Sequence, residues 1–428
     1  MKITGLSARE ILDSRGIPTI EATIELDARY QAKGAVPSGA STGTTEVLEL
    51  RDGDPSRYFG KGTLSAVRSV VENIAPALIN KEFNTQKELD EYLIQLDGTE
   101  QKGSLGGNSI LAVSMAFCRA SAMTMNMPLY EYFARIFWGE EFSTRKYKMP
   151  TPMILIMEGG KHGNWATDIQ EYMIIPDQKK FTSYSECVRV GAEIFKATHD
   201  LLIQKGYAGT VGFEGAFAPI QIRSNHEAFD LILQGVTLAG YKPGTDITLA
   251  MDIAASEFFN KETGLYDLRR EDKELTGPQW IDLQREWIGK YPISSIEDGF
   301  HEEDWDMWVR FTDEFGSELQ IVGDDLLTTN VKRIRKAIEL DAVNSVLIKL
   351  NQIGTVTETL DAIKLSTEVG YSAVISHRGG ETNDDMIADL VVGTSADQTK
   401  FGGPDRGERL AKYNRMMEIE EELQQVKI

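Results

Sequence analysis

Cysteine and long apolar runs are both scarce in this chain. The 428 residues include 2 cysteines, Cys118 and Cys187, which lie in segments with a helical pattern. Neither a disulfide framework nor a cysteine metal site is predicted, which fits a reducing compartment. No apolar run approaches the roughly 20 residues of a membrane-spanning helix, and the N-terminus lacks the apolar core of a signal peptide. We therefore expect a cytoplasmic protein without a membrane partner.

Positive charge is also in deficit. Lysine and arginine number 45 against 66 aspartate and glutamate residues, so the formal net charge is −21. This charge argues against a nucleic-acid partner or an anionic membrane surface, and most of the excess acid is expected on a solvated surface. A small anionic substrate is still compatible with the sequence, because a few local cations can dominate one pocket.

The first part of the chain predicts an α+β domain over residues 1–137. Thr19–Leu26 alternates apolar and polar side chains as a half-buried strand does. Three segments with apolar residues at helical spacing follow: Ala66–Leu78, Gln86–Leu96 and Asn108–Met125. Strands followed by helices indicate an α+β domain. The polar segment Trp138–Lys148 is interpreted as a linker to a second domain.

A loop rich in glycine, serine, threonine and proline interrupts this domain at Ala35–Thr45. Its composition predicts a mobile segment. It is either a plain connector or a hinged lid that closes on a ligand, and the loop sequence alone leaves both interpretations open.

From residue 138 to residue 428, short apolar runs alternate with helical segments. We interpret eight runs as strands: Pro152–Met157, Ile169–Ile175, Thr210–Ala218, Ile247–Ala254, Ile293–Ile296, Leu319–Val322, Ser345–Leu350 and Ser372–Ile375. Most are followed by a helical pattern, and two helices are expected between the second run and the third. An α/β barrel with an irregular start is therefore predicted.

Charged residues recur at the ends of these predicted strands. They are Glu171, Glu214, Asp252, Glu297, Asp324, Lys349 and His377, with Lys400 further along the chain. In a βα barrel the C-terminal strand ends meet at one mouth and carry the active site. We therefore expect all of these side chains to face that mouth.

Asp252, Glu297 and Asp324 are carboxylates at three consecutive strand ends. Each alone could be an ordinary strand-end charge, but three hard oxygen ligands at one mouth suit Mg²⁺. Without a cation they would repel one another. A magnesium site is the favoured interpretation, and the neighbouring Asp298 and Asp325 are expected to point the other way along the pleat.

Lys349 lies near the end of an otherwise apolar strand. It either snorkels to solvent or is a desolvated lysine that acts as a general base. In the second case, positive neighbours such as Lys400 would lower its pKa. Its position after three candidate metal ligands favours the base.

Groups that could oppose such a base are expected across the barrel. They are His162, Glu171 and Glu214, and a carboxylic acid among them would suit the removal of a proton and a hydroxyl group from adjacent carbons. The metal ion would hold the enolate between base and acid. His377 and Arg378 add cationic donors, and Arg378 could clamp a phosphate or carboxylate.

Several motifs make the chain resemble the enolase family over essentially its whole length. They include ILDSRGIPT, AVPSGASTG, SLGGNSILAVS, QEYMIIP, DIAASEFF, QIVGDDLLTTN, LIKLNQIGTVTET, SHRGGET and ERLAKYNRMMEIEEEL. The resemblance implies an N-terminal α+β domain and an enolase-type (β/α)8 barrel with a ββαα(βα)6 start. It also implies a hydro-lyase, phosphopyruvate hydratase, that dehydrates 2-phosphoglycerate to phosphoenolpyruvate in glycolysis. Two Mg²⁺ ions per active site and a homodimer or higher homo-oligomer are expected.

The same resemblance implies roles for individual residues. Lys349 would take the proton alpha to the carboxylate, and Glu214, assisted by Glu171, would be the acid on the leaving hydroxyl group. The implied metal ligands are Asp252, Glu297, Asp324 and, from the loop, Ser41. The implied substrate contacts are His162, Gln170, Glu171, His377, Arg378 for the phosphate and Lys400 for the carboxylate side.

Five positions depart from the usual motifs of the family. VGDEGG has Phe213 and Ala216, SHRSGE loses a phosphate-binding hydroxyl at Gly379, IEDPF has Gly299, and the NGG before the pocket histidine has Glu158. These changes spare the residues assigned to proton transfer and metal binding. Two alternatives to an enolase acting on 2-phosphoglycerate stay open: a paralogue that dehydrates a related phospho- or phosphono-acid, and a non-catalytic scaffold.

Overall fold

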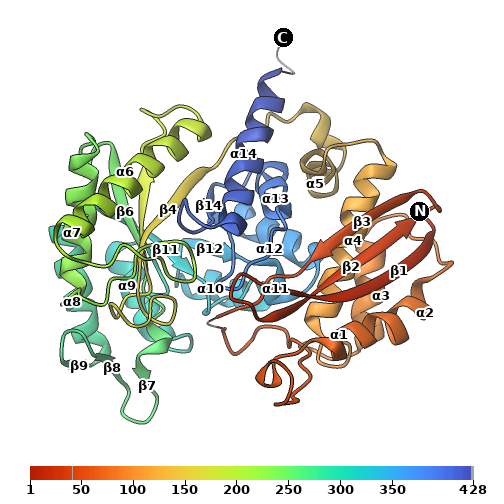
Figure 1. Ribbon diagram of the computed structural model, residues 1–428, viewed down its shortest axis with the longest axis horizontal. Coiled ribbons are helices and arrows are strands. Elements are labelled where there is room, and N and C mark those ends of the chain that lie inside the picture. Colours follow the sequence, from red (N-terminus) through yellow and green to blue (C-terminus); the bar gives the residue numbers. More distant parts are fainter. Residues whose placement is uncertain (41, 426–428) are drawn as a thin grey trace.

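The computed structural model describes residues 1–40 and 42–425, and it has two parts (Figure 1). The first part contains a three-stranded antiparallel sheet of β1 (Ile3–Leu12), β2 (Pro18–Leu26) and β3 (Tyr30–Ala35). Burial alternates along β2, as the apolar–polar pattern predicts. Helix α4 (Gly107–Thr124) packs so closely against β3 that a Cβ atom on Gly34 would come within 2.6 Å of the Ala112 carbonyl oxygen.

The predicted helices of this part are present. They and the short turns beside them are η1 (Tyr58–Gly60), α1 (Leu64–Arg68), η2 (Ser69–Ile74), α2 (Ala75–Leu78), α3 (Gln86–Asp97), α4, α5 (Leu129–Trp138) and η3 (Gly139–Thr144). The single helix expected over Ala66–Leu78 is present but contains a π-helical stretch, η2. The first part is therefore an α+β domain, as predicted.

The second part is a closed eight-stranded barrel with the strand order β10-β11-β12-β13-β14-β4-β5-β6. Its strands are β4 (Thr151–Glu158), β5 (Glu171–Pro176), β6 (Ile247–Asp252), β10 (Ile293–Glu297), β11 (Gln320–Gly323), β12 (Ser345–Ile348), β13 (Ser372–Ser376) and β14 (Gln398–Lys400). Strand β5 runs antiparallel to β4 and β6, and the other neighbours pair in parallel. Met153, Leu155 and Val322 are among the side chains of a buried cluster separate from the main core.

Helices surround the barrel in the order that the resemblance implies (Figure 1). They are α6 (Tyr184–Gln204), α7 (Asn225–Leu238), α8 (Gly277–Lys290), α9 (Trp305–Phe315), α10 (Val331–Leu340), α11 (Leu350–Ile353), α12 (Val356–Glu368), α13 (Met386–Thr394) and α14 (Gly407–Gln425). A turn, η4 (Ala255–Glu257), and a small sheet of β7 (Phe259–Asn260), β8 (Leu265–Leu268) and β9 (Lys273–Leu275) follow β6. This is the ββαα(βα)6 order with one small insertion.

No single helix among the described residues is long and apolar enough to cross a membrane. Only α4 taken together with Leu129–Thr144, across a bend of 100°, reaches that length and composition.

Three expectations about the barrel are wrong. Thr210–Ala218 is a loop, not a strand: Gly215 has φ +78°, and the segment makes only isolated bridges such as Val211 with Phe217. The eighth strand is instead β14, whose three residues give no apolar run and are fixed by pairing with β13 and β4. One helix, α6, also replaces the two expected after β5.

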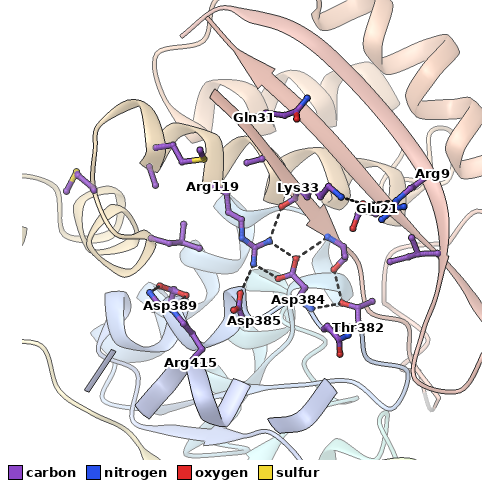
Figure 2. Close-up of a pocket in the computed structure, with 18 of the residues that line it drawn as sticks. Arg9, Glu21, Gln31, Lys33, Arg119, Thr382, Asp384, Asp385, Asp389 and Arg415 are labelled. Carbon is purple, nitrogen blue, oxygen red and sulfur yellow. Dashed lines mark hydrogen bonds and ion pairs between the residues drawn. The ribbon is translucent and has the colours of Figure 1, made fainter. Parts of the chain in front are cut away.

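An arginine on α4 connects the two parts (Figure 2). The Arg119 guanidinium donates to both carboxylate oxygens of Asp384, at 2.5 and 2.7 Å, and to Asp385 at 3.0 Å. Asp384 also accepts the backbone N–H of Ala35 at the end of β3. Burial raises the pKa of Asp384, but the ion pair with Arg119 outweighs burial and lowers it. The charged form of Asp384 therefore links α4, β3 and the segment before α13.

Replacing Arg119 with methionine should weaken this contact and lower the melting temperature measured by calorimetry. Removing one partner of a buried pair costs about 3–5 kcal/mol, and somewhat less is expected here because the Arg119 side chain is 20% exposed. Arg9→Met is the control, since Arg9 is 65% exposed in its pair with Glu21, and such pairs contribute about 0–1 kcal/mol. Equal melting temperatures for the two variants would contradict the assignment.

Candidate active site

The predicted site residues converge on one mouth of the barrel. Because β5 is reversed, its first residue, Glu171, pairs with Asp252 at the end of β6, and Asp252 pairs with Glu297 at the end of β10. The expectation that Glu171 ends its strand is therefore wrong, although it lies at the predicted mouth. Glu214 is not on a strand at all, and its loop between α6 and α7 carries it to the same cavity.

Lys400 lies among the carboxylates. Its Nζ atom is 2.8 Å from both oxygens of Glu297, 3.0 Å from Asp252 and 3.3 Å from Glu171. Gln170 also donates to Asp252, at 3.3 Å. Burial lowers the pKa of Lys400, but these carboxylates outweigh burial and raise it well above its usual value. Lys400 is therefore a fixed positive charge.

Lys349 pairs with the third predicted metal ligand. Its Nζ atom lies 2.5 Å from Asp324 Oδ2, and Gln352 donates to Oδ1 of the same carboxylate at 2.7 Å. Burial lowers the pKa of Lys349, but contact with Asp324 outweighs burial, and the net shift is upward. The predicted lowering is wrong for this arrangement. Arg378 and Lys400 do act in the predicted direction, but the carboxylate in direct contact dominates.

Asp252, Glu297 and Asp324 offer the oxygen donors that a hard cation requires. Burial, together with repulsion from Asp252, raises the pKa of Glu297 well above its usual value, so further positive charge at this position would be stabilising. Lys400 and Lys349 are the counter-charges in this arrangement. The donor set fits Mg²⁺, which binds through a few carboxylates and keeps water or substrate oxygens in its remaining positions.

Asp298 and Asp325 lie closer to Asp324 than strand alternation predicts. Carboxylate oxygens of the three residues lie within 4.8 Å of one another, and Asp298 accepts the backbone N–H groups of Asp324 and Asp325, both at 2.9 Å. The alternation fails because Asp298 follows the end of β10 and has φ +45°. Asp298 thus orients the backbone that presents Asp324 to the mouth.

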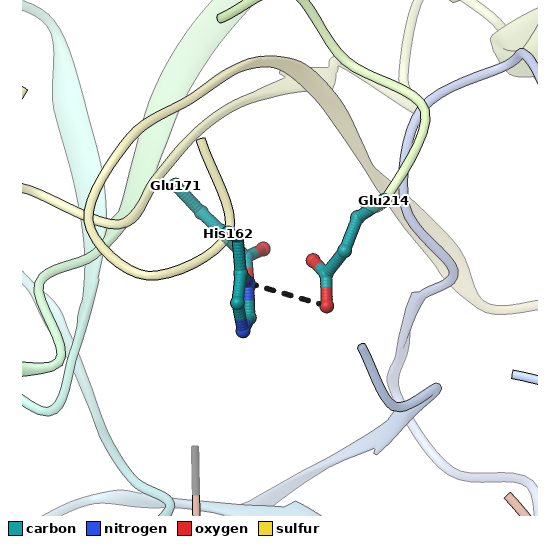
Figure 3. Close-up of side chains that lie close together, drawn as sticks. All are labelled: His162, Glu171 and Glu214. Atoms are coloured by element: carbon teal, nitrogen blue, oxygen red, sulfur yellow. Dashed lines mark ion pairs between the residues drawn. The ribbon is translucent and has the colours of Figure 1, made fainter. Parts of the chain in front are cut away.

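His162, Glu171 and Glu214 form a second cluster (Figure 3). His162 Nδ1 lies 3.3 Å from Glu214 Oε1 and 3.7 Å from Glu171 Oε1, and all three side chains are buried. Strand β5 lies four strands from β12 in the eight-stranded barrel, so the cluster faces Lys349 across the mouth. One potential ligand atom from each lies within 4.8 Å of the others, which is compact enough to share a proton or to hold a cation.

The pKa shifts place a proton on His162 in this cluster and leave Glu171 about half protonated near neutral pH. Burial raises the pKa of Glu214, but His162 and His377 outweigh burial and lower it well below its usual value. Burial lowers the pKa of His162, but Glu214 and Glu171 outweigh burial and raise it to about 10. Burial and repulsion from Glu214 raise the pKa of Glu171 to about 7. Near neutral pH the proton therefore resides on His162, beside Glu214.

His377 is neutral, so the expectation of a cationic donor at this position is wrong. Burial lowers its pKa to about 3. Arg409 donates to Nδ1 at 2.6 Å, which leaves Nε2 protonated, 3.4 Å from Glu214 Oε2. The buried guanidinium of Arg409 supplies the positive charge here. Arg378, in contrast, is a cation, as predicted, and its burial lowers its pKa less than Glu46 raises it.

The described residues of the loop, 35–40 and 42–45, lie against the site. Ser38 and Gly380 exchange backbone hydrogen bonds of 2.8 and 2.9 Å. Ala40 lines a cavity of about 10 Å³, which holds about one water molecule. A Cβ atom on Gly379 would lie 2.7 Å from the Ala40 Cβ atom, so the loop uses the space that a side chain at position 379 would need. Ser41, the predicted ligand from this loop, lies outside the described residues.

Several residues that complete the site were missed. Glu46 accepts from Arg378 at 3.0 and 3.1 Å. Gln352 donates to Asp324, Arg409 donates to His377, and Glu158 accepts from the backbone of Glu214. Gln352 could have been found, because it follows Lys349 by three residues. Glu46 and Arg409 are far from their partners in the sequence, and no local pattern indicates them.

Known proteins share this sequence over nearly its whole length. A family model for the enolase N-terminal domain matches residues 3–133, and one for the enolase C-terminal TIM barrel domain matches residues 146–428. Two curated relatives named enolase come from Bifidobacterium adolescentis and Bifidobacterium longum subsp. infantis. Each is 49% identical over 421 residues, which span 98% of this chain and 94% of the relative. The chain therefore belongs to the enolase family and is an enzyme of the lyase class.

Proposed function

We propose that this chain, a phosphopyruvate hydratase, dehydrates 2-phosphoglycerate to phosphoenolpyruvate with bound Mg²⁺. One observation carries the proposal: the buried Lys349 faces the protonated His162–Glu214 pair across a mouth lined with carboxylates. A base and an acid on opposite sides suit the loss of a proton and a hydroxyl group from adjacent carbons. The family membership and the names of the relatives support the same reaction.

Lys349 is the proposed base, which takes the proton from the carbon next to the substrate carboxylate. A general base works best when its pKa is near the working pH. If Asp324 and Glu297 serve as metal ligands, their attraction for the Lys349 ammonium group would weaken, whereas Arg378 and Lys400 act to lower the pKa of Lys349. The ion pair with Asp324 thus keeps Lys349 protonated until substrate and metal are bound.

Glu214 is the proposed acid. The proton it needs resides on His162, 3.3 Å away, and moves to Glu214 as the substrate carbon–oxygen bond breaks. The departing hydroxide takes the electron pair of that bond and accepts the proton, so it leaves as water. Glu171, whose pKa is about 7, can return a proton to the cluster after each turnover.

Asp252, Glu297 and Asp324 would hold Mg²⁺, and we propose Ser41 as a ligand of a second ion. Bound Mg²⁺ supplies positive charge that offsets the negative charge developing on the substrate carboxylate. The proposed substrate contacts are Arg378 for the phosphate, Lys400 for the carboxylate side, and His162, Gln170, Glu171 and His377 around them.

The departures from the family motifs do not open the pocket. Ala40 takes the space beside Gly379, and the closed cavity is about 10 Å³. The loss of the hydroxyl group at position 379 therefore leaves no extra space in the pocket for a bulkier substrate. A scaffold is disfavoured, because buried charges at this density are costly and only a reaction makes use of them.

Four further statements are proposals. The resemblance supports a role in glycolysis and assembly as a homodimer or higher homo-oligomer, while the sequence pattern and composition support a domain boundary between residues 137 and 138 and a cytoplasmic location.

Purified protein with Mg²⁺ and 2-phosphoglycerate should form phosphoenolpyruvate, followed by its ultraviolet absorbance. Lys349→Met should lower kcat about 10²–10⁴-fold, because the general base is lost. Lys102→Met removes another buried lysine, paired with Glu358 outside the site, and should leave kcat unchanged. Full activity in Lys349→Met would refute the assignment. Wild-type protein that exchanges only the alpha proton of a related phosphono-acid would favour the paralogue.

Chelation with EDTA should abolish turnover, and added Mg²⁺ should restore it. Because Mg²⁺ binds the folded chain, it should also raise the melting temperature, with about 2.7 kcal/mol of stabilisation at a hundredfold excess over Kd. In Asp252→Asn, added Mg²⁺ should raise the melting temperature much less. Asp267→Asn, at an exposed carboxylate on β8, should show the full rise. An equal rise in both variants would exclude Asp252 as a ligand.

Gly379→Ala should hinder closure of the loop over the substrate. The added methyl group would meet Ala40, and overpacking of this kind costs about 1–3 kcal/mol, which corresponds to a rise in KM of roughly 5- to 100-fold. Gly289→Ala on α8 adds a methyl group in open space and should leave KM unchanged. Identical KM values for the two variants would show that closure does not depend on position 379.

A further inference from the structure

Glu158 places a carboxylate directly beneath the loop that carries Glu214. It is the last residue of β4 and is only 2% exposed. Its two oxygens accept the backbone N–H of Glu214, at 3.2 and 3.3 Å, and Oε1 also accepts the N–H of Ala216 at 3.1 Å. Two amide groups of one turn therefore point at a single side chain.

The turn packs tightly against the Glu158 side chain. A Cβ atom on Gly212 would lie 2.6 Å from both Cδ and Oε1 of Glu158, and Gly215 has φ +78°. The outer side of the turn is held by Arg406, which donates to the Gly212 carbonyl at 3.1 Å, and by Arg409, which donates to the Phe213 carbonyl at 3.1 Å. The inner side is held by Glu158.

Electrostatics argue that Glu158 is not there to stabilise the fold. Among the described residues, no lysine or arginine pairs with it. Burial and the negative charge of Glu214 both raise its pKa, to about 8. Burying an acid beside a second buried acid is costly, and His162 and the amide groups of residues 214 and 216 offset this cost only in part. The purpose that its contacts indicate is the position of Glu214.

Positions 213, in the turn, and 158, beneath it, both depart from the motifs of the family. The resemblance leads one to expect an acid at position 213, directly before the catalytic glutamate, and this chain has a phenylalanine that is 41% exposed. The same resemblance leads one to expect asparagine at position 158. Relative to the family motifs, this chain therefore lacks the acid at position 213 and has an acid at position 158 instead.

We propose that Glu158 is a positioning residue for Glu214, which it holds through the backbone amides of residues 214 and 216. The inference rests on the proposed function, because it assigns Glu158 to one step of the proposed reaction. Glu158 serves the step in which the hydroxyl group leaves, and it has no part in proton removal by Lys349.

The test separates these two steps in one sample. Loss of water is followed by the ultraviolet absorbance of the product, and proton removal by exchange of the alpha hydrogen of 2-phosphoglycerate with D2O, measured by NMR. Glu158→Ala should lower the rate of water loss about 10²-fold, the usual cost of a misplaced catalytic group. The exchange rate should stay near that of wild type. Glu158→Gln keeps one acceptor oxygen and should lose less than Glu158→Ala.

The control is Glu257→Gln, which removes a carboxylate that pairs with Lys161, next to His162 in the chain. It should leave the ratio of exchange to water loss unchanged. Equal losses of both rates in the Glu158 variants would indicate a merely structural role and overturn the inference, as would no loss of either. If the wild-type chain does not dehydrate 2-phosphoglycerate, both the proposed function and this inference are overturned.

Discussion

Carboxylates buried at one barrel mouth require positive charge within a few ångströms, and the rest of the site depends on how that charge is supplied. Asp252 and Glu297 share Lys400, while Asp324 holds Lys349. A buried pair is stable only if both partners remain. Lysines therefore supply the positive charge at this mouth, and the proposed binding of a divalent ion to the same carboxylates would change what those lysines can do.

The same principle governs the opposite side of the mouth. Glu214 forms an ion pair with a protonated His162, as Lys349 does with Asp324. Each proposed catalytic group is thus held in the protonation state opposite to the one that it needs for the reaction. Lys349, His162 and Glu214 line one cavity that holds about one water molecule, so little bulk water reaches these groups when the pairs open. Exposed pairs would exchange protons with solvent instead.

Local patterns predicted the barrel and most of its charged strand ends, because apolar runs and helical spacing are short-range signals. They did not reveal that β5 is reversed, and they assigned Thr210–Ala218 to a strand although its glycines form the turn that carries Glu214. The pKa of Lys349 was predicted in the wrong direction, because spacing along the chain does not show which charge is in contact. Glu46 and Arg409 depend on contacts across the whole fold, which no local pattern contains.

The central claim is that Lys349 and Glu214 act on opposite sides of one substrate. A crystal structure with Mg²⁺ and 2-phosphoglycerate tests it most directly. Lys349 Nζ should have left Asp324 and lie about 3–3.5 Å from the carbon next to the carboxylate, with Glu214 about 2.6–3.2 Å from the hydroxyl oxygen on the adjacent carbon. A complex in which Lys349 still pairs with Asp324, or both groups lie on one face of the substrate, would contradict the account.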